Sequence, residues 1–162
     1  MGAACRVRAA EMADYPAVER IMMQVQNLHV LWRPDVYRPV ETAIPREEFQ
    51  KSVSDGLFFV AEAEGKTVGI LQILIRRVRA PHQVPRDVLF VETMAVDEPS
   101  RGQGVGHAFF DFLRAYRDEK GLDGIELQVN ARNARAMEMY EKCGFTPKSV
   151  NMELLEQEEQ TE

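Results

Sequence analysis

The sequence has no run of about 18 apolar residues, the length that a membrane-spanning helix needs. It has only two cysteines, Cys5 and Cys143, too few to form a framework of disulfides. Residues 1–14 carry four charged side chains and lack the apolar core of a secretory signal. We therefore expect a cytoplasmic protein whose thiols stay reduced.

Positive charge is scarce relative to negative charge. The 162 residues include 20 Lys and Arg against 26 Asp and Glu, so the formal net charge is −6. Binding to DNA or RNA regardless of sequence depends on clustered cations, so we expect no nucleic-acid partner. The missing apolar run likewise predicts no membrane partner. Length and composition are those of one globular domain over residues 1–162, whose acidic end, residues 156–162, is expected to fray.

Hydrophobic periodicity divides the first 96 residues into strands and helices. After Asp14, apolar residues recur at three- and four-residue steps, which predicts a helix that ends before Pro34. Pro45, followed by acidic residues, predicts the start of a second helix. A tight turn at residues 64–66 predicts an antiparallel hairpin. In order, the expected elements are strand 5–9, helices 14–33 and 45–55, and strands 57–63, 67–77 and 88–96.

The second half of the sequence alternates between the same two kinds of element. Helix 107–120 is expected to end at Gly121, and strand 124–129 follows it. Asn133 is a suitable N-cap for helix 134–143. Val150, Met152 and Leu154 alternate with polar residues, which predicts a last strand over 149–155. Helices then have to cover both faces of a mixed sheet.

A glycine-rich segment separates the strand that ends at residue 96 from helix 107–120. It reads Arg101-Gly102-Gln103-Gly104-Val105-Gly106. The first N–H groups of a helix lack intrahelical partners and carry partial positive charge, which favours a phosphate there. Glycine has no Cβ to obstruct a ligand, and Arg101 adds a permanent positive charge. The segment is therefore either a pyrophosphate site or only a tight connection between a strand and a helix.

Two other phosphate-binding motifs fit this segment poorly. A P-loop requires Gly-Lys followed by Ser or Thr, whereas this sequence has Gly106-His107. A dinucleotide-binding motif requires Gly-x-Gly-x-x-Gly in a βαβ unit, and here the last glycine is one residue too close. Glu126 stands at roughly the spacing of a ribose-binding acid, but the segment follows three strands that include a hairpin. A dinucleotide-binding domain therefore stays a minor alternative.

Several segments resemble one known family. Arg101-x-x-Gly104-x-Gly106 resembles the acyl-CoA signature of the GNAT superfamily of N-acetyltransferases. The strand end before that signature is similar here, with the sequence Met94-Ala95-Val96-Asp97. The later strand and helix are also similar, with Asn130-x-x-Asn133-x-x-Ala136-x-x-x-Tyr140-x-x-x-Gly144-Phe145. Residues 150–155 resemble the closing strand, so the resemblance covers most of the chain from residue 57 onward.

The resemblance implies an α/β (α+β) fold, with one GNAT-like domain whose mixed, mostly antiparallel sheet is splayed at the centre. It implies acetyl-CoA as co-substrate, with the pantetheine arm between the splayed strands, and it implies no metal. The amide near Ala95 is expected to stabilise the oxyanion that develops on the thioester. The residues expected to bind acetyl-CoA are Met94, Ala95, Val96, Arg101, Gly102, Gln103, Gly104, Val105, Gly106, His107 and Asn133.

Transfer of the acetyl group to a primary amine by direct attack needs a base for the amine and a hydrogen-bond donor for the departing sulfur. Tyr140 matches the family position that faces the sulfur, so the resemblance implies that it is the general acid. Two-residue alternation places Glu92 on the strand face of Met94 and Val96, which makes it the first candidate for the base. Glu126 is the second candidate. Gln128 occupies the position of an acid in some relatives but cannot act as one.

The acceptor amine is not readable from the sequence, and a small molecule or a peptide is expected. His29 and Trp32 lie where relatives keep a lid over the acceptor, so they and Glu92 are candidates for acceptor contact. Cys143 is expected to pack in the core rather than to carry the acyl group. Many relatives are dimers, which leaves a homodimer open. The alternative function is an acyl-CoA-binding module without turnover.

Overall fold

The computed structural model of the chain describes residues 4–156. The chain divides after Gln128 into two compact units, here called the first unit and the second unit. Within residues 4–156, no helix combines the length and the apolar character needed to cross a membrane.

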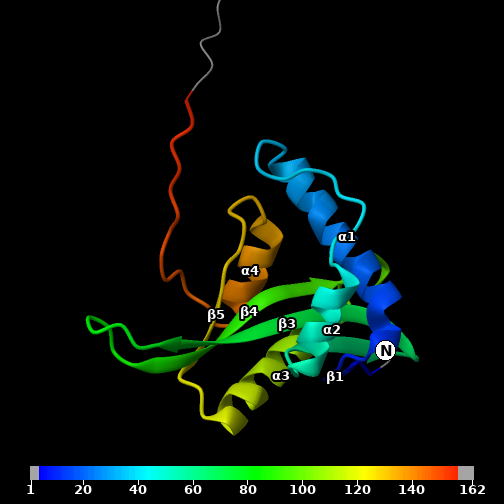
Figure 1. Ribbon diagram of the computed structural model, residues 1–162, viewed down its shortest axis with the longest axis horizontal. Helices are drawn as coiled ribbons and strands as arrows, with labels where there is room; N and C mark the ends of the chain where they lie inside the picture. The colour runs from blue at the N-terminus through cyan, green and yellow to red at the C-terminus, as the bar shows by residue number, and fades with distance from the viewer. Residues whose placement is uncertain (1–3, 157–162) are drawn as a thin grey trace, which may run out of the picture. The chain divides into compact units, whose positions relative to one another are not determined.

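The first unit holds most of the regular structure (Figure 1). Its strands are β1 (Arg6–Ala9), β2 (Phe58–Ala63), β3 (Lys66–Val78), β4 (Arg86–Val96) and β5 (Gly124–Leu127). Its α-helices are α1 (Tyr15–Trp32), α2 (Arg46–Ser54) and α3 (Val105–Lys120), with short 3-10 helices at η1 (Met12–Asp14) and η2 (Glu98–Ser100). The periodicity of the sequence predicted all three α-helices and all five strands to within a few residues.

The five strands form one sheet in the order β1-β2-β3-β4-β5. The first four pair antiparallel, and β5 joins β4 in parallel. The β2–β3 turn places Glu64 and Gly65 at positive φ, 51° and 73°, the backbone that a two-residue hairpin turn favours. The prediction of a mixed, mostly antiparallel sheet is therefore confirmed.

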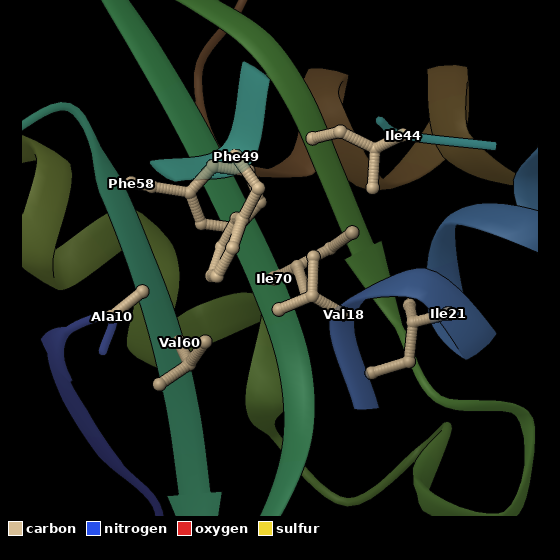
Figure 2. Close-up of a cluster of buried hydrophobic side chains, with 8 residues drawn as sticks. All are labelled: Ala10, Val18, Ile21, Ile44, Phe49, Phe58, Val60 and Ile70. Carbon is tan, nitrogen blue, oxygen red and sulfur yellow. The ribbon is translucent and has the colours of Figure 1, made fainter. Parts of the chain in front are cut away.

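Each face of the sheet is covered by helices. On one face, Val18 and Ile21 of α1 and Phe49 of α2 pack into a buried cluster with side chains of β2 and β3 (Figure 2). On the other face lies α3, whose Phe112 ring contacts the Phe59 ring of β2 at a centroid distance of 4.6 Å. Helices on both faces, as predicted, leave the ends of the central strands as the places where a ligand can reach the backbone.

Strands β4 and β5 pair over only part of their neighbouring stretch. Their register runs from Val88 to Val91 on β4, where Val91 lies opposite Leu127. The pairing of β4 with β3 continues to Val96, and its register shifts by one residue at Gln72 and Ile73. This shift is a β-bulge that inserts Glu92 as an extra residue in β4. Within the first unit, β4 beyond the bulge therefore has a strand on its β3 side alone, which is the splay that the family resemblance implied.

In the described part of the second unit, residues 129–156, the chain forms one helix, α4 (Ala134–Lys142). The side-chain oxygen of Asn133 accepts a hydrogen bond from the N–H of Ala136 at 3.1 Å, which confirms Asn133 as the N-cap. The chain leaves the helix through Gly144, at φ 94°. The helix prediction for 134–143 is thus correct to one residue.

The strand predicted over residues 149–155 is wrong, because the described residues after Gly144 form no regular secondary structure. Val150, Met152 and Leu154 are 73%, 87% and 97% exposed. Alternation of apolar residues specifies only the two sides of a strand, and a strand also needs a partner for its backbone groups. Of the predicted fraying end, residues 157–162 lie outside the described residues.

Candidate functional site

The start of α3 presents free backbone N–H groups beside glycines. Its first hydrogen bond runs from the N–H of Ala108 to the carbonyl of Gly104, 3.1 Å, so the amides of residues 105–107 precede the helical ladder. Gly102 and Gly104 have φ of 76° and 86°, and a Cβ built on either would meet no atom within 4 Å. Val105, the first residue of α3, is buried, so it fixes the start of the helix against the core. Backbone donors, a helix dipole and open space above them suit a phosphate group.

Arg101 and Gln103 are exposed on the same segment and also tie it to neighbouring backbone. The Nε of Arg101 donates to the carbonyl of Val96 at 3.3 Å, and the amide of Gln103 donates to the carbonyl of Pro99 at 3.3 Å. His107 is exposed in the first turn of α3. The structure therefore brings the end of β4 and residues 101–107 together in the first unit, as the sequence predicted.

The open side of β4 can be assigned to particular backbone amides. The N–H of Asp97 donates to the carbonyl of Val68 on β3 at 2.8 Å. Because backbone N–H groups alternate sides along a strand, the amide of Ala95 points toward β3 as well. The amides of Met94 and Val96 then point to the side where β5 is no longer paired. Within the first unit, these two amides, rather than the amide of Ala95, therefore lie on the side of β4 that has no paired strand.

The two candidate bases have different surroundings. Glu92 is exposed at the bulge, and the inserted residue breaks the two-residue alternation that linked it to the face of Met94. Regular alternation therefore no longer supports placing Glu92 on the face of Met94, and that placement stays a prediction. Glu126 lies on β5 and forms an ion pair with Arg86 at 3.1 Å. The Glu126 carboxylate is therefore already held by an arginine.

Asn133 and Tyr140 belong to the second unit. Tyr140 lies near the end of α4, and its ring packs beside Phe145 at a centroid distance of 5.8 Å. Burial raises the pKa of the Tyr140 phenol above its ordinary value. The phenol therefore stays protonated at neutral pH and can act as a hydrogen-bond donor. The oxygen of the Asn133 side chain is already used to cap α4.

The other predicted acceptor residues gather at the far end of α1. The rings of His29 and Tyr37 stack at a centroid distance of 4.8 Å, and Trp32 lies 5.8 Å from His29. Burial lowers the pKa of His29 below its ordinary value, so the neutral ring is favoured. Farther along the segment that follows α1, the carboxylate of Glu19 accepts hydrogen bonds from the amides of Ala43 and Ile44. These two bonds tie the end of that segment back to α1.

One network beside this site was not foreseen from the sequence. Arg20 and Gln24 of α1 both bind the buried carboxylate of Asp97, at the end of β4. Their i, i+4 spacing would have placed them on one helix face, but nothing in the sequence pointed to Asp97 as their partner.

Comparison with known proteins places most of the chain in one family. Residues 23–145 match the model of the acetyltransferase (GNAT) family. An uncharacterized N-acetyltransferase of Methanocaldococcus jannaschii is 33% identical over 100 residues, which is 62% of this chain and 43% of that protein. A streptothricin acetyltransferase of Escherichia coli is 32% identical over 66 residues, or 41% of this chain and 38% of that enzyme. The chain thus spans less than half the length of these two relatives.

A third curated relative and several solved structures are also similar. An aminoglycoside N(6')-acetyltransferase of Stenotrophomonas maltophilia is 26% identical over 104 residues, 62% of this chain and 68% of that enzyme. The structure of a mutant of the BH1408 protein from Bacillus halodurans superposes with a TM-score of 0.87 at 28% identity, covering 94% of this chain and 99% of that one. Glucosamine-6-phosphate N-acetyltransferase of Arabidopsis thaliana shares the fold, with a TM-score of 0.64 at 21% identity, covering 94% and 98%.

Proposed function

Because this chain belongs to the acetyltransferase (GNAT) family, we propose that it transfers the acetyl group of acetyl-CoA to a primary amine by direct attack. One observation carries the proposal. Beyond Val91, β4 has no β5 residue paired with it, and the glycine-rich start of α3 follows soon after the end of this strand. The unpaired side of a strand can bind an extended chain that contains amides, and the start of a helix can bind phosphate. Coenzyme A contains both parts in one molecule.

The residues of the first unit fit this co-substrate. The outward amides of Met94 and Val96 would pair with the pantetheine arm as an added strand. Amides at residues 103–107 would hold the diphosphate, with Arg101 supplying positive charge. Gly102 and Gly104 have no side chain that would occupy the space of a phosphate. Asn133, at the start of α4, would contact the arm of the cofactor as the family resemblance implies.

Acetyl-CoA supplies a thioester whose carbonyl carbon is open to attack by an amine. The amine must first lose its proton, and exposed Glu92 at the bulge would accept that proton directly or through water. The amide of Met94 or Val96 would donate to the carbonyl oxygen as negative charge develops there. Tyr140 would donate to the departing sulfur, because its raised pKa keeps the phenol protonated. The acceptor would meet the aromatic cluster of His29, Trp32 and Tyr37.

Two measurements on the full chain test the proposal. Titration calorimetry with coenzyme A should give binding at one site. Release of free thiol from acetyl-CoA should then be followed with a panel of amines that includes streptothricin, an aminoglycoside, polyamines, amino acids and peptides. Binding together with amine-dependent thiol release supports the proposal. Binding without release by any amine favours an acyl-CoA-binding module instead, and no binding of coenzyme A contradicts both.

A further inference from the structure

Asp97 is a buried acid at the junction between β4 and the glycine-rich segment. Only 7% of it is exposed. Its Oδ1 atom accepts a hydrogen bond from the guanidinium of Arg20 at 2.6 Å and another from the side-chain amide of Gln24 at 2.8 Å. Both donors come from α1, which lies about 75 residues earlier in the chain. A buried carboxylate requires such partners, because it is costly to bury without them.

The same network also holds the backbone that follows Asp97. The carbonyl of the Gln24 side chain accepts from the N–H of Glu98 at 3.1 Å. The N–H of Asp97 bonds to Val68 on β3, and its carbonyl accepts from the N–H of Ser100, both at 2.8 Å. The first residues of the segment are thus fixed from two directions, by a neighbouring strand and by a helix.

The rest of the segment has few constraints of its own. Residues 101–104 are exposed, and Gly102 and Gly104 have backbone freedom that other residues lack. The two side-chain bonds that reach back from this stretch, from Arg101 and Gln103, are both 3.3 Å long. A loop that is disordered before binding pays the entropy of ordering when a ligand arrives, which lowers affinity. The bonds at Asp97 therefore affect how far the backbone amides of the segment are ordered before a ligand binds.

We infer that Asp97, Arg20 and Gln24 are positioning residues that hold the 97–106 segment in the shape that binds diphosphate. This inference rests on the proposed function. In this inference the three residues act through the backbone of the segment rather than through contact with the diphosphate. Arg20, Asp97 and Gln103 line one depression of about 600 Å³, so the network and the segment form a continuous surface.

The chain contains a matched network that serves as a control. Asp14 is 8% exposed and is bound by Arg8 through two hydrogen bonds of 2.8 Å and by Thr67 at 3.1 Å. Like Asp97, it is a buried carboxylate paired with an arginine, although its remaining donors are the hydroxyl of Thr67 and the backbone N–H of Glu11 at 2.8 Å. This second network joins β1 and β3 to η1 rather than to the 97–106 segment. Asp14→Asn should therefore cost stability without changing the segment.

The test compares Asp97→Asn, Gln24→Ala and Arg20→Lys with Asp14→Asn in the full chain. Calorimetry with coenzyme A should show Kd raised about tenfold, or 1.4 kcal/mol, in Asp97→Asn. Gln24→Ala should give a smaller rise, and Arg20→Lys, which keeps the charge, should bind nearly as the wild type does. Pantetheine, which lacks the diphosphate, should bind all variants equally. Asp14→Asn should bind coenzyme A within about twofold of the wild type.

Amide hydrogen exchange of residues 97–106 without ligand gives a readout that does not depend on binding. Exchange should be faster in Asp97→Asn and Gln24→Ala than in the wild type or in Asp14→Asn. Unchanged exchange and unchanged Kd in both Asp97→Asn and Gln24→Ala would overturn the inference. An equal loss of affinity in Asp14→Asn would overturn it too. If the wild type fails to bind coenzyme A, the proposed function fails. Exchange then still decides whether Asp97 holds the segment. Gln24→Ala, which leaves the ion pair intact, covers the case in which Asp97→Asn does not fold.

Discussion

Both ends of α3 carry a glycine in the left-handed region of backbone space. Gly104 precedes the helix at φ 86° and Gly121 follows it at φ 64°. Any other residue at either position costs about 1–2 kcal/mol of backbone energy. A substitution at either position therefore meets the same kind of backbone strain. The electrostatic surroundings differ, because only Gly104 lies at the positive end of the helix dipole.

We predict that Gly104→Asp abolishes binding of coenzyme A, since its carboxylate would occupy the space of the diphosphate and repel its charge. Asp is one of the few residues besides glycine that adopt the left-handed region, so the helix should still form. Calorimetry with coenzyme A measures the effect. Gly121→Asp is the control, with the same strain and charge at the opposite end of the helix. It should lower the free energy of unfolding and leave Kd unchanged. Retained affinity in folded Gly104→Asp would contradict the phosphate site.

The proposed role of Tyr140 is chemical rather than one of binding. We predict that Tyr140→Phe lowers kcat at least tenfold, roughly 1.4 kcal/mol, and leaves the Kd of coenzyme A nearly unchanged. The reason is that the phenylalanine ring keeps the packing beside Phe145 but loses the proton donor. Steady-state kinetics with the best amine of the panel measures kcat. Tyr116→Phe, on α3, is the matched control, and an equal kcat in both variants removes Tyr140 from the mechanism.

At the scale of elements, α3 packs on β3 through a glycine. A Cβ on Gly69 would come within 2.9 Å of both the Phe109 ring and the Val105 side chain. Phe109 is fully buried and Val105 is the first residue of α3. We predict that Gly69→Ala lowers the free energy of unfolding by about 1–3 kcal/mol, because the buried side chains of Phe109 and Val105 would have to shift to admit the methyl group. Urea unfolding measures this quantity.

Gly124→Ala on β5 provides the control for that change, since a Cβ there would meet nothing within 4 Å. It should be neutral or slightly stabilising, because alanine restricts the unfolded chain more than glycine does. A Gly69→Ala variant as stable as Gly124→Ala would show that the α3 contact yields without cost. Such a result would also weaken the view that the start of α3 is rigidly placed.

The elements themselves were largely predictable from local signals. The alternation of apolar residues, Pro45 at a helix start and Gly121 at a helix end each express a preference of a few neighbouring residues. The bulge at Glu92 was not predictable, because it depends on how β4 aligns with β3. The strand prediction for residues 149–155 was wrong for a related reason, since alternation of apolar residues does not provide a partner strand. Position in the register is a property of two segments, not one.

For the molecule as a whole, acid should weaken the fold through two carboxyl groups. Burial opposes ionisation of Asp14 and Asp97, but hydrogen bonds and charge from Arg8 and Arg20 outweigh it. The pKa of each carboxyl therefore lies below its ordinary value. Such a group stabilises the fold above its unfolded pKa, near 3.9, and this stability is lost as the pH falls through the folded pKa.

We predict that the free energy of unfolding falls steadily as the pH is lowered below about 5. The double variant Asp14→Asn with Asp97→Asn should start from a lower stability at neutral pH and depend less on pH in the acid range. Urea unfolding at several pH values measures both curves. Parallel curves for the two proteins would show that other groups cause the acid sensitivity.

In the candidate site, as in the fold, local features were predictable from the sequence and contacts between distant segments were not. The glycine-rich segment was predictable because its chemistry lies in consecutive residues. The choice of Met94 and Val96 over Ala95 required the hydrogen bond between Asp97 and Val68. The network of Asp97 with Arg20 and Gln24 required α1 to lie against the end of β4, which no local pattern encodes. Contacts between distant segments are therefore what the structure adds.

The unpaired side of β4 also bears on self-association. Free amides and carbonyls along a strand are a template on which the strand of another molecule can pair. Purified protein without coenzyme A should therefore aggregate more readily than protein supplied with it, which light scattering can follow during storage. The bulge limits this tendency, because only residues 93–96 of β4 continue in regular register beyond it. A feature that opens the sheet for a small molecule thus also leaves only a short stretch of β4 on which a second molecule could pair.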